Sequence, residues 1–272
     1  MTDIHRVLIT GSAGRVGRPL CDALRGRFDV LRLLDRAHPS PRHEGDEVIE
    51  GDIRDPDVVR GAVAGCDAIV HLAAIPDEVA PFAEILQVNI GGTQVLLEAA
   101  RVHGVRRVVI ASTSRVTGLH PRDQRLDTSA PVRPDTFYAV SKVATEALGR
   151  FYAERFGLEV ACLRIGSCME RPVDTRHLST WLSHPDLASY VYRCLVAPDL
   201  SYSVLYAVSN NRRTWWDDSE ALRLGIERSD DAERFASGVA ADESPWTGVQ
   251  GLPAPDSLYS APGLDPARTE AG

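Results

Sequence analysis

The sequence predicts an α/β fold in which helices cover both faces of one parallel, doubly wound sheet. Two observations lead to this prediction: apolar runs of strand length recur along the chain, and longer amphipathic stretches separate them. Such stretches are long enough for the crossovers that parallel strands require. The predicted strands span 7–10, 30–34, 48–49, 68–71, 108–111 and 160–165, and the predicted helices span 16–25, 56–64, 81–103 and 136–156.

Beyond residue 165 the apolar rhythm becomes irregular, and its clearest elements are a helix at 185–196 and a strand at 204–208. From residue 242 onward, five prolines lie among glycines with few apolar residues, a composition typical of a segment without regular structure. The sequence therefore predicts a core at 1–165, a small C-terminal lobe at 166–240 that covers a substrate, and a Pro/Gly-rich tail at 241–272.

Composition limits the possible partners and compartment. The 272 residues carry a formal net charge of −8 with no basic block, which argues against a nucleic-acid partner. The N-terminus leads directly into a strand pattern, so we expect neither a signal peptide nor a membrane span. The five cysteines are scattered without a C-x-x-C pair, so we expect no metal site and reduced thiols in the cytoplasm.

The first predicted strand ends in a glycine turn that opens the first predicted helix. Glycines there let the backbone approach a pyrophosphate, whose charge faces free N–H groups and the positive end of the helix. The pattern predicts a Rossmann-type dinucleotide site. The turn residues expected to hold the cofactor are Gly11, Gly14, Arg15, Val16 and Gly17.

The second predicted strand leads to Asp35, roughly 20 residues beyond the turn, where a carboxylate should bind the adenine ribose diol. This carboxylate would repel a 2′-phosphate, so NAD is favoured over NADP. Arg36 keeps NADP open, because an arginine beside the ribose could accept that phosphate or stack on adenine. Asp52 and Ile53 follow the third strand and should lie beside the adenine ring; the alternative for Asp52 is capping the next helix.

Tyr138 and Lys142 lie four residues apart in a helical pattern, on one face of the helix. A phenol has an ordinary pKa near 10, so a tyrosine that acts as a base near neutral pH needs a cation to favour its ionised form. Lys142 is placed to be that cation. A hydroxyl partner is expected where the strand at 108–111 ends, and residues 112–114 are all hydroxyl residues.

Together, the glycine turn, the hydroxyl cluster and the Y-x-x-x-K spacing resemble the extended short-chain dehydrogenase/reductase family over roughly residues 4–165. In that family the catalytic hydroxyl precedes a glycine by five positions, which implies Thr113, five positions before Gly118. His71 is more simply interpreted as a buried strand-end histidine with satisfied hydrogen bonds. The resemblance also implies cofactor contacts from Leu72, Ala73, Ala74 and Asn89.

Further segments, including 164–168, the run Ser-Thr-Trp-Leu-Ser-His at 179–184 and residues 215–217, resemble NAD-dependent uronate dehydrogenases within that family. The likeness extends to about residue 236. It implies that Arg176 binds the sugar carboxylate with its guanidinium fork and that Ser167 lines the sugar site. The alternative for Arg176 is a surface ion pair with Asp174 or Asp186.

The chain departs from that group at two substrate positions. Ser114 and Arg115 replace the usual Asn-His, and near Pro76-Asp77 a substrate-facing serine is missing. Arg115 either adds a second cation for a carboxylate or points to solvent, whereas Asp77 facing the sugar would disfavour an acid.

The resemblance therefore implies an enzyme that oxidises the anomeric carbon of a hexuronic acid to a lactone with formation of NADH. A neutral aldose dehydrogenase is the main alternative. A nucleotide-sugar epimerase or dehydratase is a weaker one, because few residues follow the last core strand. A non-catalytic NAD-sensing protein is disfavoured by the complete catalytic set. The family also implies a homo-oligomer paired through the helices at 81–103 and 136–156.

Overall fold

The computed structural model describes residues 4–38, 44–76, 80–241 and 248–251. Its centre is a sheet of seven parallel strands in the order β3-β2-β1-β4-β5-β6-β9. These strands are β1 (Arg6–Thr10), β2 (Val30–Asp35), β3 (Glu47–Glu50), β4 (Ala68–His71), β5 (Arg107–Thr113), β6 (Glu159–Ile165) and β9 (Tyr202–Ala207). The predicted α/β fold and doubly wound sheet are confirmed.

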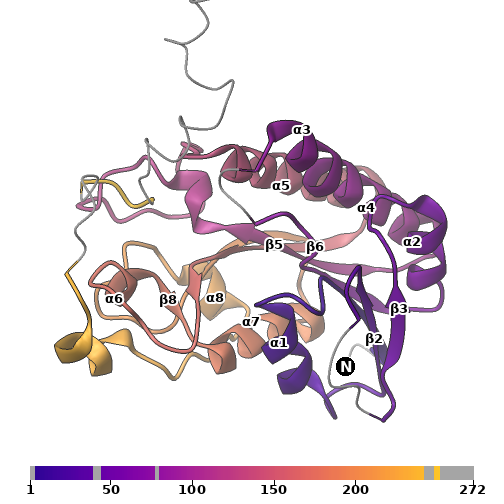
Figure 1. The fold of residues 1–272 in the computed structure, drawn as a ribbon, viewed down its shortest axis with the longest axis horizontal. Helices are drawn as coiled ribbons and strands as arrows, with labels where there is room; N and C mark the ends of the chain where they lie inside the picture. Colours follow the sequence, from indigo (N-terminus) through magenta and orange to yellow (C-terminus); the bar gives the residue numbers. More distant parts are fainter. Residues whose placement is uncertain (1–3, 39–43, 77–79, 242–247, 252–272) are drawn as a thin grey trace, which may run out of the picture.

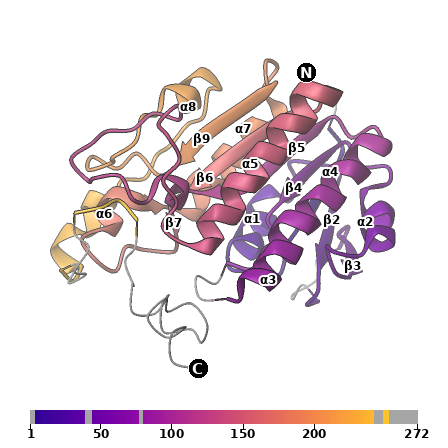
Figure 2. The same cartoon turned by 90° about the horizontal axis from the view of Figure 1, so that it is seen from above.

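Helices cover both faces of the sheet (Figure 1). One layer contains α2 (Pro56–Val63), α3 (Phe82–Ile85), α4 (Gly92–Val102) and α5 (Phe137–Phe156). In Figure 2, α4 lies between α5 and α2, and α3 lies at one end of α4. The opposite layer contains α1 (Gly17–Leu24), α7 (His184–Val196) and α8 (Ser219–Arg223). Each layer buries its own apolar cluster against the sheet, so the central strands are apolar on both faces, as buried parallel strands require.

The helix predicted at 81–103 contains a segment of different winding. Between α3 and α4 the backbone forms the π-helix η1 (Leu86–Gly91), and the chain stays helical across both junctions. The extra residue per turn is the usual form of a π-bulge, which often marks a functional site. Asn89 lies in this segment and is buried.

The strand predicted at 204–208 is present as β9, but it belongs to the central sheet. Leu205 and Ala207 pack in one core layer, and Tyr202 and Val204 pack against the other. A strand that is covered on both faces must lie between the helix layers, so β9 and α7 belong to the core. This corrects the predicted boundary at residue 165.

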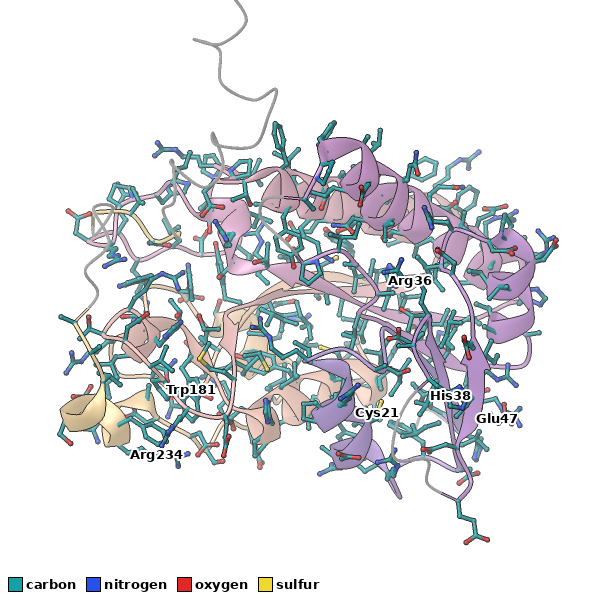
Figure 3. The ribbon with its side chains drawn as sticks, viewed as in Figure 1. Cys21, Arg36, His38, Glu47, Trp181 and Arg234 are labelled. Carbon is teal, nitrogen blue, oxygen red and sulfur yellow. The ribbon has the colours of Figure 1, made fainter. Side chains whose placement is uncertain are left out.

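The remaining lobe is small. Its short strands β7 (Ser167–Cys168) and β8 (Trp181–Leu182) pair in parallel beside α6 (His177–Thr180) and the 3-10 helix η3 (Ala232–Gly238). Trp181 is fully buried here, with the guanidinium of Arg234 5.4 Å from its ring centroid (Figure 3). Of the predicted tail, only 241 and 248–251 lie within the described residues.

Candidate active site

A cavity of about 800 Å³ opens at the carboxyl ends of the parallel strands, next to β1 and β4, where the winding of the sheet reverses. Open α/β sheets bind ligands at this position. Every residue predicted to bind cofactor or substrate, except Asn89, lines the cavity. They are Gly11, Gly14, Arg15, Val16, Gly17, Asp35, Arg36, Asp52, Ile53, Leu72, Ala73, Ala74, Thr113, Ser114, Arg115, Tyr138, Lys142, Ser167 and Arg176.

The glycine turn fits a dinucleotide because its backbone has no room for side chains. A Cβ on Gly11, which has a φ of +72°, would lie 2.7 Å from the amide nitrogen of Ala73, and one on Gly17 would lie 2.2 Å from the carbonyl oxygen of Gly11. The N-terminus of α1 has no side-chain cap. Its first N–H groups therefore have no side-chain acceptor, and the turn residues before them line the cavity, as a pyrophosphate site requires.

Acidic groups lie on the cavity wall where the adenine ribose is expected. The Asp35 carboxylate accepts hydrogen bonds from the amides of Ala13, at 2.9 Å, and Ala37, at 3.0 Å. One acceptor position per oxygen is used in this way, which leaves lone pairs for a ribose diol. Asp52 binds the Arg54 guanidinium through both oxygens, whereas Asp55 caps α2. The alternative that Asp52 caps this helix is therefore wrong.

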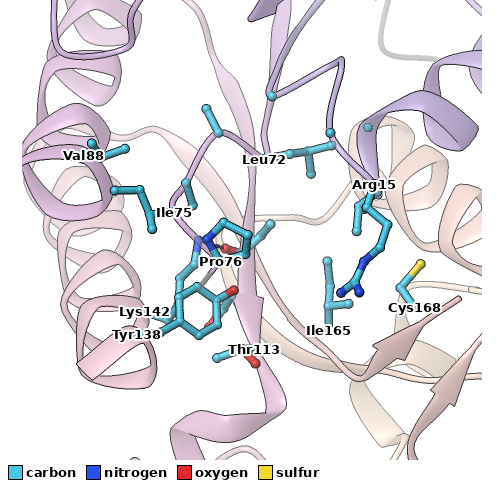
Figure 4. A pocket seen from close by; sticks show the side chains of 18 of the residues that line it. Arg15, Leu72, Ile75, Pro76, Val88, Thr113, Tyr138, Lys142, Ile165 and Cys168 are labelled. Atoms are coloured by element: carbon cyan, nitrogen blue, oxygen red, sulfur yellow. Dashed lines mark hydrogen bonds between the residues drawn. The ribbon is translucent and has the colours of Figure 1, made fainter. Parts of the chain in front are cut away.

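Tyr138, Lys142 and Thr113 gather on one side of the cavity (Figure 4). The Thr136 hydroxyl caps α5 by accepting the Ala139 amide, which places Tyr138 in the first turn of the helix. The Lys142 ammonium lies 5.7 Å from the Tyr138 ring centroid and donates to the carbonyl oxygen of Ala111, at 2.7 Å. Phenol, ammonium and hydroxyl thus border one space.

Burial shifts the proton equilibria of this group. Desolvation raises the pKa of Tyr138 to about 12, and the nearby cations that oppose this shift are Arg115 and Arg15. Desolvation lowers the pKa of Lys142 to about 8. Arg115 and Arg15 are therefore the cations that lower the Tyr138 pKa in this structure, a role that the sequence assigned to Lys142.

Asn89 and His71 lie one layer behind the cavity. The Asn89 amide exchanges hydrogen bonds with the backbone of Ile75 and donates to the Ser141 hydroxyl, which itself donates to the Tyr138 carbonyl. Asn89 therefore connects the loop after β4 to α5, and the predicted cofactor contact does not appear in the cavity lining. His71 is bonded through both ring nitrogens to threonine hydroxyls, as the simpler interpretation predicted.

Two buried arginines, Arg115 and Arg176, also line the cavity. Arg176 is 5% exposed; its Nη2 donates to the carbonyl oxygen of Gln250, at 3.0 Å, and its Nε has no hydrogen-bond partner among the described residues. Burial, followed by the charges of Arg115 and Arg122, lowers the pKa of Arg176 to about 10. The predicted alternative of a surface ion pair with Asp174 or Asp186 is wrong.

Arg115 is also buried and does not point to solvent. Its Nε lies 3.0 Å and 3.1 Å from the two carboxylate oxygens of Asp135. Burial raises the pKa of Asp135, and the Arg115 guanidinium opposes that shift. The departure at this position thus places a second guanidinium near Arg176, partly balanced by one carboxylate. Asp77 lies outside the described residues.

Sequence reasoning missed several residues that build the site. Asp135 and Gln250 contact the two arginines, and Glu146 joins Ser112 to Arg164 in a buried network behind β5. None of these residues belongs to a spaced motif. The one available signal was the acidic residue directly before the helix cap at Thr136, and it did not indicate a partner.

Comparison with known proteins places this geometry in context. A family model described as the NAD dependent epimerase/dehydratase family matches residues 7–180. The chain belongs to this family. The predicted membership of the extended short-chain dehydrogenase/reductases is thereby confirmed.

Within the family, the chain is 40% identical to a uronate dehydrogenase of Pseudomonas putida, over 90% of this chain and 91% of that protein. The solved structure of a uronate dehydrogenase variant from Agrobacterium tumefaciens complexed with NAD is 39% identical, with a TM-score of 0.86 over 91% of this chain and 96% of that one. A glucuronic acid dehydrogenase from Chromohalobacter salexigens is 35% identical, with a TM-score of 0.87 over 94% and 97%.

In the part of the chain that the structure describes, no cluster of three or more His, Cys, Asp or Glu side chains is arranged to hold a metal ion. Nor does any helix of that part have the length and apolarity needed to span a bilayer.

Proposed function

We propose that this protein oxidises the anomeric carbon of a hexuronic acid, galacturonate or glucuronate, to an aldarolactone while NAD is reduced to NADH. The observation that carries the proposal is Arg176, a buried guanidinium in the same cavity as Tyr138 and Lys142. A buried cation with an unused donor fits a carboxylate in bidentate geometry. The uronate dehydrogenases to which the chain is similar support the same assignment.

The glycine turn with Arg15 and Val16 would hold the pyrophosphate, and Asp35 the adenine ribose. Arg36, Asp52 and Ile53 would line the adenine pocket, with Leu72, Ala73 and Ala74 along the dinucleotide and Asn89 supporting the wall. NAD, when bound, supplies the acceptor for the electron pair and the hydrogen that leave the sugar carbon.

The chain's own residues move the proton and hold the sugar. Tyr138, in its ionised form, takes the proton of the anomeric hydroxyl, and Thr113 hydrogen-bonds the same oxygen. The charges of Arg115 and Arg15 favour the ionised phenol. The ammonium of Lys142, 5.7 Å from the phenol ring centroid, adds to that positive field. Arg176 fixes the carboxylate end of the sugar, with Ser114, Arg115 and Ser167 along its length, so that the anomeric hydroxyl meets Tyr138.

The test is NADH formation by the purified protein with galacturonate, glucuronate, galactose, glucose and arabinose, each with NAD and with NADP. We expect steady NADH accumulation with the uronates and NAD. Turnover of the neutral sugars instead would identify a neutral aldose dehydrogenase, whereas sugar conversion without NADH accumulation would identify an epimerase or dehydratase. Preference for NADP would overturn the role given to Asp35.

The same proposal includes a homo-oligomer in a reducing, cytoplasmic compartment. Phe82, Phe151 and Phe156 are 40%, 53% and 43% exposed on α3 and α5, the helices expected to pair between copies. The five cysteines are all buried and free. Light scattering on the purified protein should give at least twice the 29.6 kDa mass of one chain, and Phe151→Glu should shift the mass toward that of the single chain.

A further inference from the structure

Residues 248–251, here called the strap, run antiparallel to the segment 118–122 that follows β5. Arg122 donates its amide to Gly248, Gln250 donates its amide to His120, and Gly251 donates its amide to Gly118, at 3.0, 2.8 and 2.7 Å. Arg122 also donates through Nε to the Val249 carbonyl, at 2.7 Å. The strap is therefore fixed along its length by backbone hydrogen bonds.

The Gln250 side chain locks the strap to the core. It is 1% exposed; its Oε1 accepts the indole N–H of Trp216 at 2.9 Å, and its Nε2 donates to the carbonyls of Pro121 and Gln124 at 3.0 and 2.8 Å. Both amide donors and the amide oxygen are thus engaged. Together with the backbone bonds of Gln250 and Gly251, these side-chain bonds hold the Gln250 carbonyl in place.

That carbonyl is the acceptor for Arg176 Nη2, and in the described ranges the Arg176 guanidinium has no other hydrogen-bond acceptor. A long arginine side chain has many rotamers, so a single fixed acceptor decides where its remaining donors point. Gly251 adds a second contact. A Cβ there would lie 1.9 Å from Asp135 Oδ2, so the strap backbone packs directly on the carboxylate that holds Arg115.

We propose that the strap is a positioning element of the sugar-acid site, in which Gln250 orients Arg176 toward the substrate carboxylate. The inference rests on the function proposed above and adds a specificity role for a segment that lies far in the sequence from Tyr138, Lys142 and Arg176. Gln250 does not touch the reacting atoms; it acts through Arg176. Its loss should therefore weaken binding of the carboxylate end of the substrate while leaving the proton transfer at Tyr138 intact.

The experiment is a double-mutant cycle in the full-length protein with the variants Gln250→Met and Arg176→Met. Gln250→Met keeps the volume but removes all three side-chain hydrogen bonds. We expect it to raise KM for the uronate about tenfold to a hundredfold, the range of one charge-assisted contact, with a much smaller change in kcat. In the Arg176→Met background the same substitution should change KM less than twofold, because the residue through which Gln250 acts is gone.

Asn211→Leu is the matched control for general damage to the lobe. Asn211 is a buried amide that donates to the Trp181 carbonyl at 2.7 Å and accepts the Ala232 amide at 3.0 Å, with no bond to Arg176. The Asn211→Leu variant should have a lowered melting temperature, as Gln250→Met does, but its KM for the uronate should stay within twofold of wild type. NAD affinity, measured by quenching of protein fluorescence, should be unchanged in both variants.

If Gln250→Met does not accumulate in folded form, Trp216→Phe replaces it in the cycle, because it removes one of the three bonds that hold Gln250. It should raise KM severalfold, again only where Arg176 is present. Equal KM changes in both backgrounds, or none, would overturn the positioning role. Wild-type protein that fails to oxidise any uronate would instead refute the proposed function, so the two failures are separate.

Discussion

Replacing Arg176 by methionine should stabilise the protein while removing most of its activity on uronates. Folding lowers the pKa of Arg176 from 12.5 to about 10, with burial as the main cause. Since one pKa unit corresponds to about 1.4 kcal/mol, the charged form is destabilised by about 3 kcal/mol. Because the folded pKa is the lower one, this penalty applies at every pH below about 10 and is relieved only as the pH rises toward 12.5.

Part of that gain is offset in the variant. Methionine leaves the Gln250 carbonyl without its donor, which costs about 1–2 kcal/mol. The net gain of about 1–2 kcal/mol should raise the melting temperature by roughly 2–8 °C for a chain of this size. Losing two charge-assisted hydrogen bonds to the substrate carboxylate should lower kcat/KM for the uronate by about a hundredfold to a thousandfold.

Scanning calorimetry without ligands and initial-rate kinetics at pH 7–8 measure both effects, and Arg176→Lys is the matched control. Lysine keeps a buried charge without the planar fork, so it should lose activity without gaining stability. A methionine variant that melts several degrees below wild type would show that the charge is compensated within the protein. Unchanged uronate kinetics would refute the carboxylate role.

Three further predictions concern other residues of the site. Tyr138→Phe should lower kcat by about a hundredfold to ten-thousandfold while the Kd for NAD, measured by fluorescence, stays unchanged; retained turnover would reject the tyrosine base. Asp35→Ala should raise KM for NAD at least tenfold and reduce the preference for NAD over NADP, and an unchanged preference would remove Asp35 from the ribose site. Burial lowers the pKa of His71 to about 3. The free energy of unfolding should therefore fall as the pH drops from 6.5 toward 3, by about 3 kcal/mol at pH 4. Urea unfolding should show this acid loss of stability to be steeper in wild type than in His71→Gln.

The sequence was informative wherever function depends on local spacing at the end of a strand. The glycine turn follows β1, and Asp35 and Thr113 are the last residues of β2 and β5. Parallel strands bring these carboxyl ends to one edge of the sheet. Tyr138 and Lys142 needed only the helical repeat to share a face. For these residues, knowing the fold class was enough to place them in one cavity.

Other parts of the site depend on contacts between distant segments, which no local pattern records. Arg115 meets Asp135 across 20 residues, and Arg176 meets Gln250 across 74. In the sequence, β9 is an isolated apolar run. Only the structure, in which both core layers cover this run, shows that it is the seventh strand of the sheet. The π-helical turn around Asn89 keeps a helical apolar pattern, so the sequence gives no sign that the hydrogen-bonding register has changed.

The two arginines at the sugar end differ in a way that bears on ligand binding. Arg115 has a carboxylate at hydrogen-bond distance, whereas the guanidinium of Arg176 donates to one neutral carbonyl. The charges of Arg115 and Arg122 repel Arg176 more than the charges of Asp174 and Asp135 attract it. A ligand carboxylate beside Arg176 would compensate the less well compensated of the two guanidinium charges. Part of the binding free energy of a sugar acid would then come from relief of the desolvation cost that the buried Arg176 charge already has in the folded protein. A neutral sugar of the same shape offers no such relief. We therefore propose that discrimination between acid and neutral sugars originates in the buried, incompletely compensated charge of Arg176, whose guanidinium donates to the strap carbonyl of Gln250.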